Sequence, residues 1–262
     1  MTKETLLHAT DLYTTIQKIE QLLTIFEKNS IEEVKVRGFD WKPSTEQETR
    51  IRTAILADQR EELERLKSIY LFVRDEIQFG YNVDDSIPAS RVLADGYGQC
   101  NTKGTLFMAL LRACGIPCRV HGFTIDKKLQ KGAMTGVVYR NAPQNVFHSW
   151  VEVCLEDQWY ELEAFILDSD YLHRLQKKYS DCTGAFCGYG VAVKDFQHPT
   201  IDFDRNNTYI QSEGINQDFG VYDSPDELLR EHHQEMSALK AFMYRNLGRH
   251  LMNRNVRKIR NS

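Results

Sequence analysis

The sequence predicts a mixed chain of helices and strands, on three observations. Apolar residues recur at helical spacing over long stretches near both ends of the chain. A shorter helical stretch, residues 99–113, stops at Gly115-Ile116-Pro117. Residues 147–163 have the pattern of a β-hairpin. With 262 residues, the chain is long enough for one large domain or two small ones.

The composition is ordinary for a globular protein and limits the expected partners. The apolar fraction is 42%, the charged fraction 27% and the formal net charge −4, so nucleic acid is not expected as the main partner. No apolar run approaches the length of a membrane span, and the N-terminus lacks the apolar region of a signal peptide. With six cysteines and no export signal, we expect a cytoplasmic protein with reduced thiols.

The first half of the chain is expected to be mainly helical. Apolar periodicity predicts helices over residues 4–29, 44–79 and 99–113. A connector over residues 30–45 and a polar loop over residues 81–88 separate them. Residues 118–125 have strand character, and residues 126–145 form a long connection of the kind that is more often functional or mobile than inert.

The second half is expected to alternate between short strands and helices. After the hairpin we predict a helix near residues 168–177 and short strands at Gly190–Val193 and Thr208–Gln211. A last helix begins at Ser224, which is followed by proline and two acidic residues in the first turn. We expect this helix to run to about residue 256, with a break near Gly248.

One cysteine lies where a thiol can ionise. Cys100 follows Gly96-Tyr97-Gly98-Gln99 at the start of the predicted helix 99–113. Unpaired backbone N–H groups and the positive end of the helix dipole favour negative charge at that place. His148 lies further along the chain in the strand-like run Phe147–Val153. A cysteine at a helix start and a histidine on a downstream strand suggest nucleophilic acyl chemistry.

The third residue of such a site depends on the register of the hairpin. A two-residue turn at Glu156-Asp157 makes His148 and Glu163 diagonal neighbours on one face, with backbones about 7–8 Å apart. A carboxylate there would fix the tautomer of the imidazole and stabilise its protonated form. A three-residue turn would move Glu163 to the opposite face. The alternative carboxylates are Glu161, Glu152 and Asp168.

The chemistry explains why these residue types are needed. A neighbouring imidazole takes the proton of the thiol, and the thiolate attacks a carbonyl carbon to form a thioester. Water or an amine then releases the acyl group. The oxyanion needs donors, for which the candidates are the backbone N–H of Cys100 and the side chain of Gln99 or Tyr97.

Four blocks of the sequence, taken in order, carry a family pattern. They are Ser90–Cys100, with its Gly98-Gln99-Cys100 end, Ala109–Gly122, with Gly115-Ile116-Pro117-Cys118-Arg119, His148-Ser149-Trp150-Val151-Glu152-Val153 and Trp159-Tyr160-Glu161-Leu162-Glu163. These blocks resemble the transglutaminase-like superfamily of papain-like cysteine enzymes. On this resemblance Cys100 is the nucleophile and His148 the base, while Glu163 stands where the family usually has aspartate.

The resemblance covers roughly residues 65–165 and implies an α+β fold. In that fold the nucleophile helix packs on an antiparallel sheet that carries the histidine and the acid. The domain organisation then consists of a helical extension over residues 1–60, a transglutaminase-like core over 61–222 and a basic amphipathic helix over 223–262, all in one compact domain. Calcium-dependent members of the superfamily exist, but no EF-hand-like run is present, and we expect neither a metal nor a cofactor.

The superfamily includes amide hydrolases, peptidases, transamidating acyltransferases and members without activity. The leading prediction is a cysteine enzyme that cleaves an amide or peptide bond, or transfers its acyl group, with a peptide, a protein or a small amide as substrate. The alternative is a non-catalytic binding or assembly protein that keeps the fold.

The C-terminal segment is basic. From Met236 to Ser262 there is no Asp or Glu, while lysines and arginines interleave with apolar residues. A basic amphipathic helix can bind an acidic partner or a membrane surface. More often such a helix packs its apolar face on its own domain, and this is the arrangement that we expect for residues 239–260.

Overall fold

The computed structural model describes residues 62–261. The predicted helix over residues 4–29, the connector over 30–45, the N-terminal extension over 1–60 and the first part of the predicted helix over 44–79 lie outside these residues. Within residues 62–261, no helix is both long enough and apolar enough to cross a membrane. All six cysteines lie in this part of the chain and are free thiols, as predicted.

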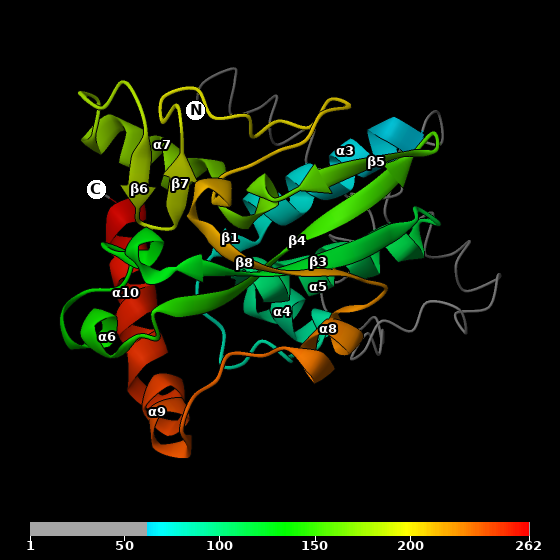
Figure 1. The fold of residues 1–262 in the computed structure, drawn as a ribbon. Coiled ribbons are helices and arrows are strands. Elements are labelled where there is room, and N and C mark those ends of the chain that lie inside the picture. The colour runs from blue at the N-terminus through cyan, green and yellow to red at the C-terminus, as the bar shows by residue number, and fades with distance from the viewer. Residues whose placement is uncertain (1–61, 262) are drawn as a thin grey trace.

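A four-stranded antiparallel sheet forms the centre of the fold (Figure 1). Its strands, in spatial order, are β5 (Gln158–Leu162), β4 (Asn145–Leu155), β3 (Cys118–Asp126) and β8 (Ile215–Tyr222). The long helix α5 (Cys100–Ala113) packs against β4 and β3. The α+β fold, with this helix on an antiparallel sheet, is therefore confirmed.

Helix α5 is buried on nearly every side, which is unusual for a helix of a globular protein. The sheet covers one side, and α3 (Glu62–Leu71) and α4 (Ala89–Asp95) contact others. The helix starts where the N–H of Gln99 donates to Thr102 Oγ1, 3.0 Å away. It stops before Gly115, whose φ of +72° suits glycine, so the predicted helix over 99–113 is confirmed to within one residue.

The β4–β5 hairpin has the two-residue turn on which the predicted position of Glu163 depends. Leu155 faces Gln158, and both turn residues, Glu156 and Asp157, have positive φ of 52° and 62°. This conformation is that of the turns whose twist matches a hairpin. The register that places Glu163 on the face of His148 is therefore present.

The predicted helix over residues 44–79 extends too far. After α3 the chain makes a π-turn, η2 (Phe72–Glu76), and then the short strand β1 (Gln78–Phe79) pairs in parallel with β2 (Tyr97–Gly98). The backbone N–H of Phe79 donates to Asp168 Oδ2 at 2.7 Å, which holds this residue in the extended conformation. The long connection over 126–145 also has structure, since it contains the 3-10 turn η3 (Lys127–Gln130) and helix α6 (Gly136–Asn141).

The predictions after the hairpin are partly right. Helix α7 (Ser169–Lys178) follows the 3-10 turn η4 (Ala164–Ile166), and β7 (Val191–Val193) pairs with β6 (Phe186–Gly188). The predicted strand at Thr208–Gln211 is wrong, because this segment makes only an isolated bridge from Thr208 to Leu162. The fourth strand of the sheet is instead β8, which follows the 3-10 turn η5 (Ser212–Gly214).

The single last helix predicted from Ser224 is wrong as well. Ser224 caps α8 (Pro225–Glu231), but the chain is extended at His232. Ser237 then caps a second helix, α9 (Ala238–Met243), which continues through the π-turn η6 (Tyr244–Gly248) into α10 (Arg249–Arg260). The predicted break near Gly248 coincides with the end of the π-turn.

Helix α10 holds the strand β1 and the residues that follow it. The side-chain amide of Asn253 pairs with both the N–H and the C=O of Tyr81, at 2.7 and 3.0 Å. Arg260 donates to the backbone oxygen of Phe79 and to both oxygens of Asp168. On the other side of the same segment, the N–H of Gly80 donates to Gly98. The C-terminal helix therefore supports the strand pair that leads into α5.

The ion pair of Arg260 with Asp168 gives a test of this support. Their side chains are 10% and 3% exposed, and removal of one partner leaves a buried charge without its counterion. We expect Arg260→Ala to lower the free energy of unfolding by about 3 kcal/mol, measured by urea denaturation. The matched control is Lys258→Ala on the exposed side of the same helix, and an equal loss in both variants would contradict the assignment.

Candidate active site

The structure places Cys100 at the first position of α5, where the sequence predicts it. The side chain is 9% exposed. The close approach of β2 to the helix depends on Gly98, since a Cβ there would lie 2.8 Å from Thr102 Oγ1 and 2.9 Å from Lys103 Cγ. The glycine before the cysteine therefore sets how the strand enters the helix.

His148 and Glu163 are both fully buried and contact each other. Nε2 of His148 lies 2.8 Å from Oε1 of Glu163, so the contact with the carboxylate uses Nε2 and not Nδ1. Nδ1 has no hydrogen-bond partner within the described part of the chain. Burial by itself would lower the pKa of His148, but the charges of the neighbouring Cys100 and of Glu163 together raise this pKa to about 10.

The second oxygen of Glu163 is held by the backbone. Oε2 accepts from the N–H groups of Ile210 and Gln211, both at 2.8 Å. The carboxylate thus has three partners although it has no contact with solvent. Such a buried acid stays fixed in position, because each of its oxygens would lose a hydrogen bond on moving.

The loop that provides these N–H groups runs beside the end of β5. The strand ends at Leu162, and the N–H of Glu163 then donates to the backbone oxygen of Thr208 at 2.9 Å. The N–H of Thr208 donates back to Glu161. The bridge between the two segments puts the next residues of the loop within reach of the carboxylate.

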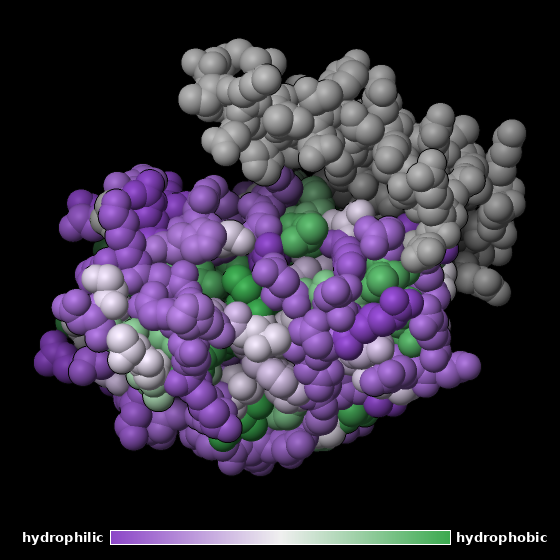
Figure 2. Space-filling model, turned by 90° about the horizontal axis from the view of Figure 1, so that it is seen from above, coloured by the Kyte–Doolittle hydropathy of each residue, from purple (hydrophilic) through white to green (hydrophobic). Residues whose placement is uncertain are grey.

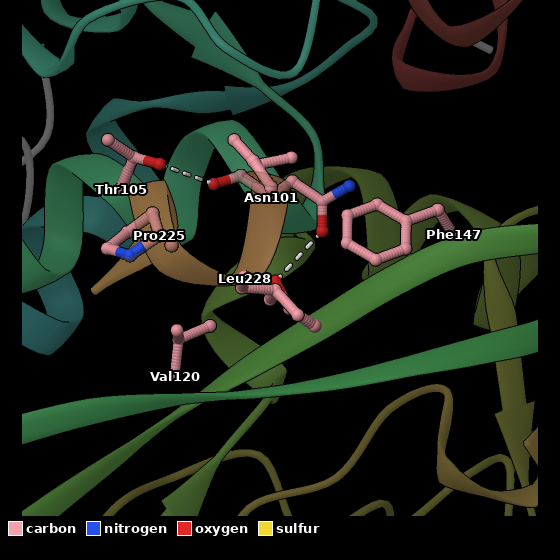
Figure 3. Close-up of a pocket in the computed structure, with 9 residues that line it drawn as sticks. Asn101, Thr105, Val120, Phe147, Pro225 and Leu228 are labelled. Atoms are coloured by element: carbon pink, nitrogen blue, oxygen red, sulfur yellow. Dashed lines mark hydrogen bonds between the residues drawn. The ribbon is translucent and has the colours of Figure 1, made fainter. Parts of the chain in front are cut away.

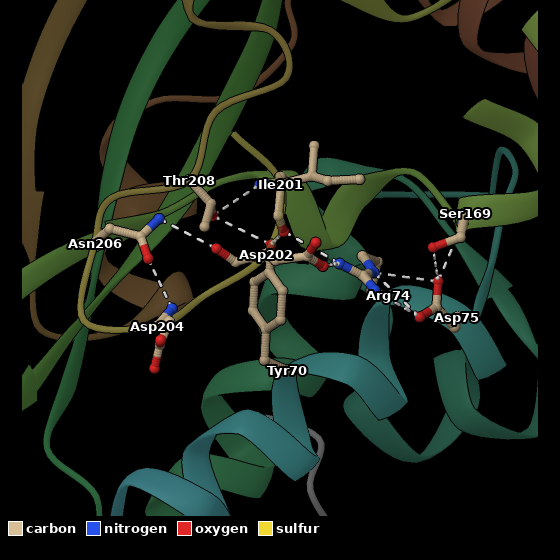
Figure 4. A network of polar contacts seen from close by, with 10 residues as sticks. Tyr70, Arg74, Asp75, Ser169, Ile201, Asp202, Asp204, Asn206 and Thr208 are labelled. Atoms are coloured by element: carbon tan, nitrogen blue, oxygen red, sulfur yellow. Dashed lines mark hydrogen bonds and ion pairs between the residues drawn. The ribbon is translucent and has the colours of Figure 1, made fainter. Parts of the chain in front are cut away.

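A polar network fixes the same loop to helix α3 and its π-turn (Figure 4). Tyr70 Oη donates to the backbone oxygen of Ile201 at 2.6 Å and contacts Thr208 Oγ1 at 3.2 Å. Arg74 donates to Ile201 and forms an ion pair with Asp202, with an N–O distance of 2.7 Å. These contacts hold both ends of the segment from residue 201 to residue 208.

Each alternative carboxylate has another partner. Glu152 contacts Arg119 and His121, Glu161 accepts from the hydroxyl of Tyr209, and Asp168 pairs with Arg260. Of the four acids that the sequence leaves open, Glu163 is the one that contacts His148 in the structure.

The residues that follow the cysteine and the histidine are joined as well (Figure 3). Ser149 Oγ donates to Asn101 Oδ1 at 2.8 Å, and both side chains are buried. This hydrogen bond links the start of α5 to β4. The cavity beside it has a volume of about 10 Å³, which is room for about one water molecule and not for a substrate.

The two side chains proposed for the oxyanion have structural contacts. Gln99 Oε1 accepts from the N–H of Asn82, and Gln99 Nε2 donates to Asp85, both at 2.8 Å. The ring of Tyr97 lies against Gly80, where a Cβ would be 2.9 Å from Cδ2. The backbone N–H of Cys100, in the first turn of the helix, belongs to the group that has no partner inside a helix.

Two tyrosines near the cysteine are not indicated by the sequence. Burial raises the pKa of Tyr81 and of Tyr244, and the charge of Cys100 adds to the effect on both. Tyr244 belongs to the π-turn η6, and its hydroxyl donates to the backbone oxygen of Asn82 at 3.0 Å. No spacing rule connects residue 244 with residue 100, so only the folded chain brings them together.

Residues 49–164 match the family model described as the transglutaminase-like superfamily. This stretch of the chain is similar to the transglutaminase-like superfamily. The match covers all three residues of the site, Cys100, His148 and Glu163. No curated protein sequence matches the chain.

Two solved structures show weak similarity to this chain. A candidate cysteine protease from Cytophaga hutchinsonii is 14% identical, with a TM-score of 0.33, over 62% of this chain and 37% of that one. Red sea bream transglutaminase is 18% identical, with a TM-score of 0.28, over 47% of this chain and 24% of that one. The chain thus spans well under half of either protein, and at these TM-scores neither similarity bears on function.

The contact between Glu163 and His148 predicts how the cysteine reacts. The backbone N–H groups of residues 210 and 211 keep an oxygen of Glu163→Gln pointing toward them, so its NH₂ group would face His148 Nε2. The imidazole must then accept at Nε2 and carry its proton on Nδ1, the wrong tautomer for a base. We expect alkylation of Cys100 by iodoacetamide at pH 7 to slow by about tenfold or more.

The same labelling has a pH dependence with a defined sign. A protonated His148, whose pKa is raised to about 10, favours the thiolate of Cys100, so labelling of the wild type should slow by less than about tenfold per pH unit from pH 8 to pH 6. Free cysteine slows by about tenfold per pH unit below about pH 8.5. Glu161→Gln on the same hairpin is the control, and a wild-type profile like that of free cysteine would rule out the pair.

Proposed function

We propose that this protein is a cysteine enzyme that acts on an amide or peptide bond through a thioester on Cys100. The observation that supports this most directly is the position of His148, which contacts Glu163 through one ring nitrogen and interacts with Cys100. A cation held between a carboxylate and a thiol favours the thiolate, which is the reactive form.

The proposed reaction begins with attack of the Cys100 sulfur on the carbonyl carbon of the substrate. The C–N bond breaks as the imidazolium of His148 gives a proton to the leaving amine, and a thioester forms. His148, now neutral, takes a proton from water or from a second amine. The attack of that nucleophile releases the acyl group and restores the thiolate and the imidazolium.

The carbonyl oxygen becomes negative during both attacks. The N–H of Cys100 and the field at the start of α5 are suited to stabilise this charge, since α5 is a helix of fourteen residues. Gln99 Nε2 carries two hydrogens, of which Asp85 takes one. Its second hydrogen makes Gln99 the better of the two side-chain candidates for a further donor.

Glu163 acts by position and charge. It keeps Nε2 protonated, so that Nδ1 is the nitrogen that exchanges the proton with sulfur. The longer side chain of glutamate, compared with the aspartate usual in the family pattern, is accommodated by the loop at Ile210 and Gln211. The substitution is therefore compatible with the role of the third residue.

Burial at the site favours a second candidate function. Cys100 is 9% exposed and His148 is fully buried, as expected for a non-catalytic binding protein that keeps the fold. The two functions differ in one step, because only the enzyme forms a covalent acyl intermediate.

Intact-mass spectrometry tests this step. Incubation with a mixed library of peptide amides and small aryl esters should add the mass of one acyl group to the wild-type chain, and proteolysis should place it on Cys100. Cys100→Ala should remain unmodified, while Cys187→Ala, which removes an exposed thiol, should react like the wild type. Equal acylation of Cys100→Ala, or no acylation together with ordinary alkylation of Cys100, would favour the non-catalytic protein.

A further inference from the structure

The C-terminal arm, residues 238–260, has one side that packs on the protein and one that does not. Its inward side buries Met252, Val256 and Ile259 and makes the hydrogen bonds of Asn253 and Arg260 described above. The second half of the arm therefore contacts the protein through this side. In Figure 1 the other end of the arm, α9, extends away from the sheet.

The outward side of the arm carries an apolar row. Five of the ten exposed large hydrophobic side chains in residues 62–261 lie within this short stretch: Leu239 (72% exposed), Phe242 (62%), Met243 (48%), Leu247 (49%) and Leu251 (44%). Elsewhere, such as on the face seen in Figure 2, hydrophobic residues lie scattered among hydrophilic ones. A concentration of this kind on a protein surface marks an interaction site that residues 62–261 leave uncovered.

The π-turn η6 keeps the row straight. Positions 239, 243, 247 and 251 are four residues apart, and in a continuous α-helix this spacing drifts by about 40° at each step. A π-turn has hydrogen bonds from i to i+5 and so takes up an extra residue. Since η6 spans Tyr244–Gly248, it offsets the drift in the middle of the row and keeps Leu247 and Leu251 in line with Leu239.

The charged side chains of the arm itself all have the same sign. Seven lysines and arginines and no acidic residue occur between Met236 and Ser262. Arg245 and Arg260 form ion pairs with the body of the protein, to Asp84 and Asp168. Arg254 and Lys258 are exposed and, at three and seven residues beyond Leu251, continue the row along the same side of the helix.

The positive charge of the arm indicates what kind of partner covers the apolar row. Two copies of the arm would bring two basic helices together, which like charges oppose. An anionic lipid surface instead suits both the apolar row and the basic residues that continue it. The apolar side chains can enter the lipid interface, while the basic side chains contact phosphate groups. We propose that the C-terminal arm binds an anionic lipid surface through Leu239, Phe242, Met243, Leu247 and Leu251, with Arg254 and Lys258 at the headgroups.

The contacts of the inward side are compatible with this binding. Tyr244, between the row positions, donates to the backbone oxygen of Asn82, and the side chain of Asn253 bonds to the backbone of Tyr81. These hydrogen bonds can persist while the apolar row enters the lipid. A helix bound in this way lies in the plane of the interface, about 5–10 Å deep. The proposal does not depend on the chemistry at Cys100.

Co-sedimentation with vesicles tests the proposal on the full chain. We expect the protein to sediment with vesicles of phosphatidylcholine and phosphatidylglycerol at 3:1, to bind pure phosphatidylcholine at least tenfold more weakly, and to be partly released by 0.5 M salt. The double variant Phe242→Ser, Leu247→Ser should lose at least tenfold in affinity for anionic vesicles, and Lys258→Glu should lose a smaller factor.

The matched control is Val137→Ser, because Val137 on α6 is also 62% exposed but lies outside the row. Circular dichroism checks that every variant is folded. Absence of wild-type binding, equal binding to both vesicle types, or equal loss in the Val137→Ser control would overturn the proposal. A concentration-dependent dimer that the double variant abolishes, without vesicle binding, would overturn it in favour of a second copy.

Discussion

A carboxylate buried without solvent contact is the constraint on which the site depends. Removal of the Glu163 charge from water costs several kcal/mol unless donors replace the water, and the structure supplies three: His148 Nε2 and the N–H groups of Ile210 and Gln211. The two backbone donors are available only if the loop stays beside β5. The histidine is held in turn by the strand register that the two-residue turn sets.

Distant parts of the chain serve to keep this arrangement in place. The network of Tyr70 and Arg74 ties the donor loop to the first described helix and its π-turn. On the side of Cys100, Asn253 and Arg260 of the C-terminal helix support the strand pair that leads to this residue. The candidate site thus depends on the C-terminal helix, which lies beyond the residues that match the family model. This helix supports the site but provides none of its three residues.

The features that the sequence predicts are those set by short-range patterns, such as the end of a helix or the position of a hairpin. Glycine and proline mark the end of α5. The sequence leaves open a two- or a three-residue turn at Glu156-Asp157, and only the structure, with its two-residue turn, decides that Glu163 lies on the face of His148. The edge strand β8 escapes prediction because three consecutive polar residues, Asn216, Gln217 and Asp218, interrupt the alternation of apolar and polar residues. The donors to Glu163 are backbone groups, which leave no mark in a sequence, and the overlooked cap at Ser237 is the signal that could have divided the last helix.

We expect His148 to be a cation between Glu163 and Cys100 at neutral and mildly basic pH. Nitrogen-15 NMR of the imidazole at pH 8, assigned with His148→Gln, measures this directly, because pH 8 lies between the ordinary pKa of 6.5 and the raised value of about 10. We expect both ring nitrogens to be protonated in the wild type, and the ring to become neutral in Cys100→Ala. A neutral imidazole in the wild-type protein at pH 8 would show that Cys100 and Glu163 do not hold His148 as a cation.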